Sequence, residues 1–162
     1  MQNSFSSLEM IKIAIVLEEE GYDFYMNGIE NTDGDVHEFL LNAAGQELKH
    51  KEKFSKLYDE MSAGKEDESE YLFDNEVAQY LGGLIERRVF DKKVDCKDAF
   101  KDLKSAVKSS LNTEELTLKV YTELYKGVKH EEGKEMMNKI IDEEKQHVEY
   151  FKKLLVKLEA LV

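Results

Sequence analysis

The segment over residues 137–158 carries two ionisable side chains on the apolar face of an expected helix. Its apolar residues recur three or four positions apart, which predicts an amphipathic helix. They are Met137, Ile140, Ile141, Val148, Phe151, Leu154, Leu155 and Leu158. Glu144 and His147 fall within the same stripe, because residues three apart on a helix point the same way. Such an inward-facing pair is costly to bury unless something satisfies it, and a metal ion would do so.

A second segment, residues 36–57, repeats this pattern. Its apolar stripe consists of Val36, Phe39, Leu40, Ala43, Phe54 and Leu57. Glu47 and His50 fill the gap in that stripe, and a Phe follows the His by four residues in both segments. One Glu-x-x-His pair is weak evidence in a chain this rich in Glu, but a repeated pair on two apolar faces predicts a shared site.

The composition favours an all-α fold. The chain has 162 residues, no Pro and nine Gly, and it shows little of the alternation that is typical of strands. We expect one domain with helices over about 7–30, 36–61, 95–127 and 133–160, with Asp35 and Asp95 as N-caps of the second and third. Residues 62–94 form a long crossover connection with an extra short helix over about 76–90. This connection lets the third helix start at the same end as the second.

The charge and the cysteine count exclude several classes of function. A net charge of -12 disfavours nucleic acids and anionic membranes, whose binding depends on Lys and Arg. A single cysteine, Cys96, excludes an intrachain disulfide and a Cys-x-x-Cys site. No apolar run reaches transmembrane length, and the first residues lack the features of a secretion signal. We therefore expect a cytoplasmic protein.

The first and third expected helices also share a pattern. Glu18, Gly21 and Tyr25 lie on one apolar stripe, and Glu114, Thr117 and Tyr121 repeat them at the same spacing. Glu18 and Glu114 are 96 residues apart, and Glu47 and Glu144 are 97 apart, so the two halves of the chain agree to one residue. The neighbouring acids Glu19, Glu20, Glu115 and Glu143 are rotated off the stripes and are expected to face water.

Six residues thus form one expected constellation on four helices. A Glu from each of two helices and a Glu-x-x-His from each of two others is the known di-iron or di-manganese carboxylate arrangement. The predicted metal ligands are Glu18, Glu47, His50, Glu114, Glu144 and His147. Their four carboxylates and two neutral imidazoles would balance two divalent ions and suit Fe or Mn. The alternative is six buried groups that pair among themselves, but four Glu and two His cannot neutralise one another.

Each residue of this constellation has an expected role. Glu47 and Glu144 are expected to bridge the two metals, while Glu18 and Glu114 each close one end. Side chains lean toward the helix N-terminus, so the hydroxyls of Tyr25 and Tyr121 can reach back to the carboxylates as hydrogen-bond donors. Simple core packing with a hydrogen-bonded hydroxyl is the alternative for these tyrosines.

With these motifs, nearly the whole chain resembles the ferritin-like superfamily and, within it, the rubrerythrin-related di-iron proteins. The resemblance implies a ferritin-like four-helix bundle whose two Fe ions react with peroxide or dioxygen in oxidative-stress defence. It also leaves open a ferroxidase or iron-storage role, or a bundle that keeps the site only for stability. We expect an external electron-donor protein and a homodimer.

The chain departs from rubrerythrins proper at two points. Its single cysteine cannot build their four-cysteine rubredoxin-type iron site. Thr117 stands where rubrerythrins usually carry a further metal-ligating Glu, which lets one iron exchange a His ligand when its oxidation state changes. We therefore expect His50 and His147 to stay bound in both oxidation states, at two nearly symmetric ends.

Overall fold

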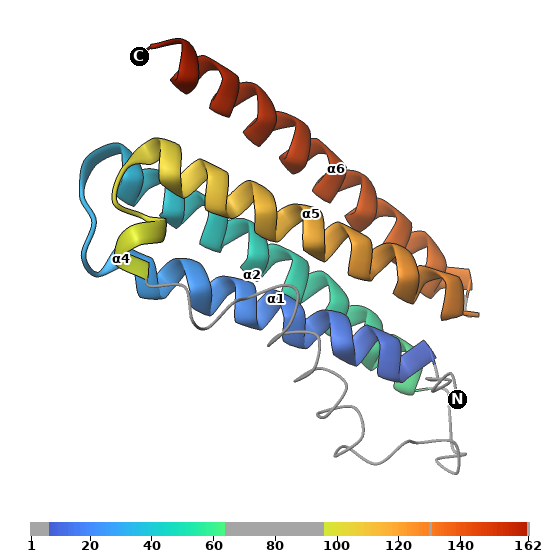
Figure 1. Ribbon diagram of the computed structural model, residues 1–162. Coiled ribbons are helices and arrows are strands. Elements are labelled where there is room, and N and C mark those ends of the chain that lie inside the picture. The colour runs from blue at the N-terminus through green and yellow to red at the C-terminus, as the bar shows by residue number, and fades with distance from the viewer. Residues whose placement is uncertain (1–6, 64–95, 130, 162) are drawn as a thin grey trace, which may run out of the picture.

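The computed structural model describes residues 7–63, 96–129 and 131–161, and every regular element in these ranges is a helix. The helices are α1 (Ser7–Ile29), α2 (Gly34–Ser62), α4 (Cys96–Ala99), α5 (Leu103–Gly127) and α6 (Glu131–Ala160). The four long ones form a bundle, which confirms the predicted all-α class (Figure 1). The helix expected over 76–90 and most of the crossover connection lie outside the described residues.

The bundle consists of two antiparallel helix pairs. The turn at residues 30–33 joins α1 to α2, and residues 128–130 join α5 to α6. Figure 1 shows that α5 begins at the same end of the bundle as α2, as the long connection predicted. It also shows α6 diverging from α5 toward its C-terminal end.

The third long helix begins later than predicted. A continuous helix from Asp95 is wrong, because the helix ends at Ala99 and α5 starts only at Leu103. Asp102 caps α5: its carboxylate accepts a hydrogen bond of 2.7 Å from the backbone N–H of Ser105. Phe100, in the break, is buried against α1, where a Cβ on Gly28 would overlap its ring.

The second helix begins slightly earlier than predicted. It starts at Gly34, whose φ of 58° suits a residue without a side chain. Asp33, rather than the predicted Asp35, occupies the N-cap position, and its side chain makes no capping hydrogen bond. The sequence therefore predicted the start of this helix to within about two residues, but not which Asp occupies the N-cap position.

The core is divided into two hydrophobic clusters. One contains Ile11, Leu17, Phe54, Leu124 and Met137 among others. The other contains Tyr25, Leu40, Ala44, Phe100 and Ala106 among others. Along α1, α2 and α5 the predicted ligands fall between the residues of the two clusters, so the polar groups occupy a layer in the middle of the bundle.

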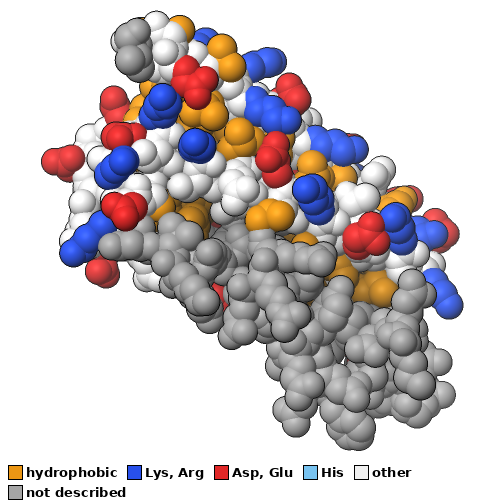
Figure 2. Space-filling view, viewed as in Figure 1, with side chains coloured by type: hydrophobic (Ala, Val, Ile, Leu, Met, Phe, Trp, Pro, Cys, Tyr) orange, Lys and Arg blue, Asp and Glu red, His pale blue; other side chains and the backbone are white. Residues whose placement is uncertain are grey.

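The surface is charged but not uniformly acidic. Figure 2 shows Lys and Asp or Glu side chains interleaved with hydrophobic ones over the face that it presents. Across α5 and α6, for example, Lys152 Nζ lies 3.4 Å from an oxygen of Glu115, one of the acids expected to face water. Within residues 7–63, 96–129 and 131–161, no helix has both the length and the hydropathy that a membrane crossing needs.

Candidate metal centre

All six predicted ligands lie in the central layer of the bundle. The four carboxylates of Glu18, Glu47, Glu114 and Glu144 are buried. His50 is 1 % exposed, whereas His147 is 23 % exposed. The imidazole rings are stacked, with centroids 5.6 Å apart and planes 17° from parallel. The structure thus brings together side chains that are up to 129 residues apart in the sequence.

These side chains form two overlapping groups that could each hold a metal ion. In each group one nitrogen or oxygen per residue lies within 4.8 Å of the others. The first group is Glu18, His50 and Glu144, and the second is Glu114, Glu144 and His147. Glu144 belongs to both, with Oε1 2.7 Å from Nδ1 of His50 and Oε2 3.4 Å from Nδ1 of His147. This is the position that a bridging carboxylate needs.

Glu47 belongs to neither group but is held beside them. A Cβ added to Gly21 on α1 would lie 2.6 Å from Oε2 of Glu47, which is closer than real Cβ contacts. Gly21 therefore provides the space for the Glu47 carboxylate. The proposed bridging role of Glu47 stays a prediction.

The contacts within the layer indicate that these residues fit a metal. Among the described residues, three ligand atoms form no hydrogen bond of normal geometry: Glu18 Oε2, His50 Nδ1 and Glu144 Oε2. The last two still lie in ion pairs, 2.7 Å from Glu144 Oε1 and 3.4 Å from Nδ1 of His147, whereas Glu18 Oε2 lies 3.6 Å from Nδ1 of His50. Four buried carboxylates share two imidazoles, so pairing among the six groups alone leaves the layer short of positive charge. Two divalent ions, bound through these same atoms, would supply it.

The electrostatics of the layer indicate the same need for cations. Burial, together with the charges of Glu18 and Glu114, raises the pKa of Glu47 well above its usual value. Burial and the Glu144 charge do the same to the pKa of Glu114. Glu47 and Glu114 therefore favour their protonated forms unless positive charge replaces the protons, as a bound metal would.

The buried carboxylates also shift the pKa of His50, in the direction that favours the protonated, positively charged imidazole. Burial alone would lower the pKa of its imidazole, but the close carboxylates of Glu144 and Glu18 raise it to about 11. Burial would likewise raise the pKa of Glu144, yet its contacts with His147 and His50 hold that pKa below its usual value. A cation on Nδ1 of His50 would take the place of the proton there.

Tyr25 and Tyr121 reach the carboxylate layer in a crossed arrangement. Tyr25 on α1 donates its hydroxyl to Oε1 of Glu114 on α5 at 3.4 Å. Tyr121 on α5 donates to Oε1 of Glu18 on α1. Burial and the adjacent carboxylates raise the pKa of both phenols, so both keep the proton that they donate. Both hydroxyls thus reach the carboxylates, and their role beside a bound metal stays a prediction.

Glu143 contacts His50, which the sequence did not predict. It was expected to face water, and its side chain is 37 % exposed, but it also contacts the site. Nε2–H of His50 donates to Oε2 of Glu143 at 2.9 Å, and Nζ of Lys53 donates to Oε1 at 2.6 Å. Such a contact orients an imidazole and selects its tautomer. Helical spacing could not reveal it, because the partner lies on another helix.

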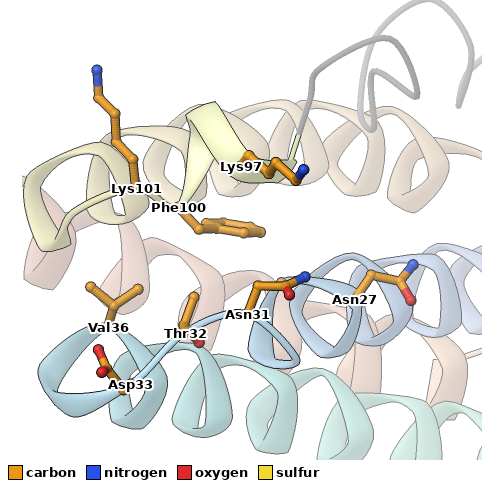
Figure 3. Close-up of a pocket in the computed structure, with 9 residues that line it drawn as sticks. Asn27, Asn31, Thr32, Asp33, Val36, Lys97, Phe100 and Lys101 are labelled. Atoms are coloured by element: carbon orange, nitrogen blue, oxygen red, sulfur yellow. The ribbon is translucent and has the colours of Figure 1, made fainter.

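A separate cavity lies at the end of the bundle where α1 turns into α2. It has a volume of about 350 Å³ and is closed on one side by α4 (Figure 3). Its lining includes Asn27, Asn31, Asp33, Lys97 and Lys101, without any predicted ligand. Because no predicted ligand lines it, this cavity is separate from the metal centre. Figure 3 shows the amine of Lys101 pointing away from the turn.

Four long helices with four buried carboxylates and two imidazoles at their centre define a ferritin-like protein of the di-metal carboxylate class. The sequence model of the Rubrerythrin family matches residues 9–155, and the chain belongs to that family. The fold is also similar to the crystal structure of a candidate ferritin-like diiron-carboxylate protein from Thermotoga maritima. The TM-score is 0.63 and the identity 23 %, over 96 % of this chain and 97 % of the other. No curated protein is significantly similar to the chain.

Proposed function

We propose that this protein binds two iron ions, with manganese as the alternative metal, and reacts with peroxide or dioxygen. The observation that carries the proposal is the central layer of four buried Glu and two His, whose ligand atoms form two groups that share Glu144. Hard carboxylate oxygens and imidazole nitrogens suit both metals. When bound, the ions would supply Lewis acidity and the electrons that reduce the oxidant.

The protein's own residues would hold and orient this centre. Glu18, His50 and Glu144 would bind one ion, and Glu114, Glu144 and His147 the other, with Glu47 as the further bridging candidate. Tyr25 and Tyr121 donate to Glu114 and Glu18, which restricts the rotation of these carboxylates. The hydrophobic clusters on either side of the layer close it toward both ends of the bundle.

The proposal extends to the protein's partners and cellular role. An external protein would supply electrons, because one cysteine cannot provide a four-cysteine relay within this chain. We further propose a cytoplasmic homodimer that acts in oxidative-stress defence. An iron-storage role is the second candidate, since the family resemblance also implies Fe(II) oxidation, and it differs in requiring a cage-sized assembly.

Metal analysis and reoxidation test the function. After anaerobic loading with Fe(II), the chain should retain about two ions. The reduced protein should then be reoxidised by hydrogen peroxide or by dioxygen, and the faster reaction identifies the oxidant. A chain that binds no iron, or whose iron is oxidised by neither, would refute the proposal. Light scattering distinguishes the roles, because a dimer favours detoxification and a cage favours storage.

A further inference from the structure

The two ends of the metal centre differ in their access to solvent. At one end, His50 is 1 % exposed, and its Nε2 is occupied by Glu143, which Lys53 also binds. At the other end, His147 is 23 % exposed. In the internal repeat, the residue before Glu144 is Glu143 and the residue before Glu47 is Gln46, so the second end has a neutral amide where the first has a carboxylate.

A cavity of about 160 Å³ lies at the more exposed end. It is bounded by α2, α5 and α6, and both Glu114 and His147 line it. The exposed Asn42 and the partly buried Gln46 line it from α2, and Tyr150, which is 61 % exposed, lines it from α6. The cavity thus connects a pair of predicted ligands with side chains at the surface. His50 and Glu18 do not line it.

From this difference we infer that the cavity is the entrance through which a small dioxygen species reaches the metal held by Glu114 and His147. The inference rests on the proposed function and names the end of the centre at which the oxidant binds. Its lining suits hydrogen peroxide or dioxygen, because amide groups and aromatic rings add no charge to the entrance. The volume accommodates a few water-sized molecules but not a large organic substrate.

Azide binding to the cobalt-loaded protein tests the entrance without catalysis. Azide is a small ligand, and its binding to Co(II) changes the visible absorption. We expect about one azide to bind per chain, at the accessible end. The variant Asn42→Phe places a ring at the mouth of the cavity and should slow azide binding by about tenfold. Tyr150→Ala opens the mouth and should speed azide binding.

The matched control is Asn138→Phe, which makes the same change at an exposed position of α6 that does not line the cavity. It should bind azide at the wild-type rate. The inference is overturned if folded, cobalt-loaded Asn42→Phe also binds azide at the wild-type rate. If Asn42→Phe does not fold or load, Tyr150→Ala decides, and an unchanged rate in that variant overturns the inference.

These outcomes are distinguishable from a failure of the proposed function. A wild-type chain that cannot bind about two metal ions refutes the function and, with it, the entrance. A chain that binds both ions and consumes peroxide, but whose entrance variants behave like wild type, refutes the entrance alone. Altered azide kinetics in a protein that neither peroxide nor dioxygen reoxidises would support the entrance and refute the function.

Discussion

The α1–α2 half and the α5–α6 half carry the same pattern of ligands in different surroundings. Each half contributes one Glu from its first helix and a Glu-x-x-His pair from its second. His50 of the first half is enclosed and bound by Glu143, whereas His147 of the second half borders a cavity. The two ends therefore share their ligand types but differ in their access to solvent, and the expectation that both His stay bound in both oxidation states stays a prediction.

A repeated ligand pattern thus sets which groups can bind metal but not how accessible they are. Glu143 of the second half contacts the histidine of the first half, and its counterpart Gln46 lines the cavity beside His147. The crossed tyrosine contacts follow the same rule, since each joins one half to the other. Each half therefore determines the surroundings of the ligands that the other half supplies.

The largest expected effect comes from Glu144→Ala. Because Glu144 is shared by both groups of ligand atoms, its removal should lower the iron content from about two ions per chain to about one or fewer. Metal analysis after anaerobic loading measures this. The control Glu149→Ala changes an exposed residue of the same helix and should load fully. Equal loading of the two variants would contradict the assignment of Glu144.

Glu143→Ala should have the next largest effect and tests the difference between the ends. Losing the partner of His50 Nε2 should weaken metal binding by about tenfold or more, as is typical for residues that orient a ligand. Competition with a chelator measures the affinity. Glu143→Gln keeps a hydrogen-bonding group and should be intermediate. Unchanged affinity in Glu143→Ala would restore the earlier expectation that Glu143 only faces water.

Gly21→Ala separates metal binding from folding. The new Cβ would displace the Glu47 carboxylate, so metal affinity should fall by about tenfold. That carboxylate ends a flexible side chain, and Ala favours a helix over Gly by about 1 kcal/mol, so the metal-free protein should not be destabilised. Thermal unfolding with and without metal measures both effects. Thr117→Ala, at the equivalent position of α5, is the control and should change metal affinity less.

A smaller effect is expected from the two tyrosines. Tyr121→Phe should weaken metal binding more than Tyr25→Phe, because the Tyr121 hydroxyl contacts both Glu18 and the carbonyl of Ala14, whereas that of Tyr25 donates to Glu114 at 3.4 Å. Each loss should be about 1 kcal/mol. Chelator competition on both variants gives the order, and the reverse order would contradict the reading of these contacts.

The smallest effect compares the helix caps of the two halves. Asp102 caps α5 through Ser105, whereas Asp33 makes no side-chain cap at α2, so Asp102→Ala should lower the Tm slightly and Asp33→Ala less. The Ser105 hydrogen bond lowers the pKa of Asp102 from its ordinary 3.8. The stabilisation of the fold by Asp102 is therefore complete above pH 3.8 and is lost as the pH falls through the lowered pKa. A Tm difference that persists in strong acid would contradict this.

The sequence by itself determined the helical class and the six candidate ligands. Apolar stripes reveal which side of a helix faces inward, so Glu18, Glu114 and the two Glu-x-x-His pairs could be found from spacing alone. The family resemblance rested on these residues and is confirmed by the family match over residues 9–155. The helix break before Leu103 was missed, because Asp102 and the buried Phe100 fit a continuous helix equally well in the sequence.

Only the tertiary structure decided how the two ends of the centre differ. Spacing along one helix carries no information about which residue of another helix lies opposite, so the contact of Glu143 with His50 could not be predicted. Accessibility depends likewise on how α2, α5 and α6 pack around Glu114 and His147, which leaves a cavity there. Burial of one imidazole and exposure of the other are properties of that packing, because each surface is completed by side chains from several helices.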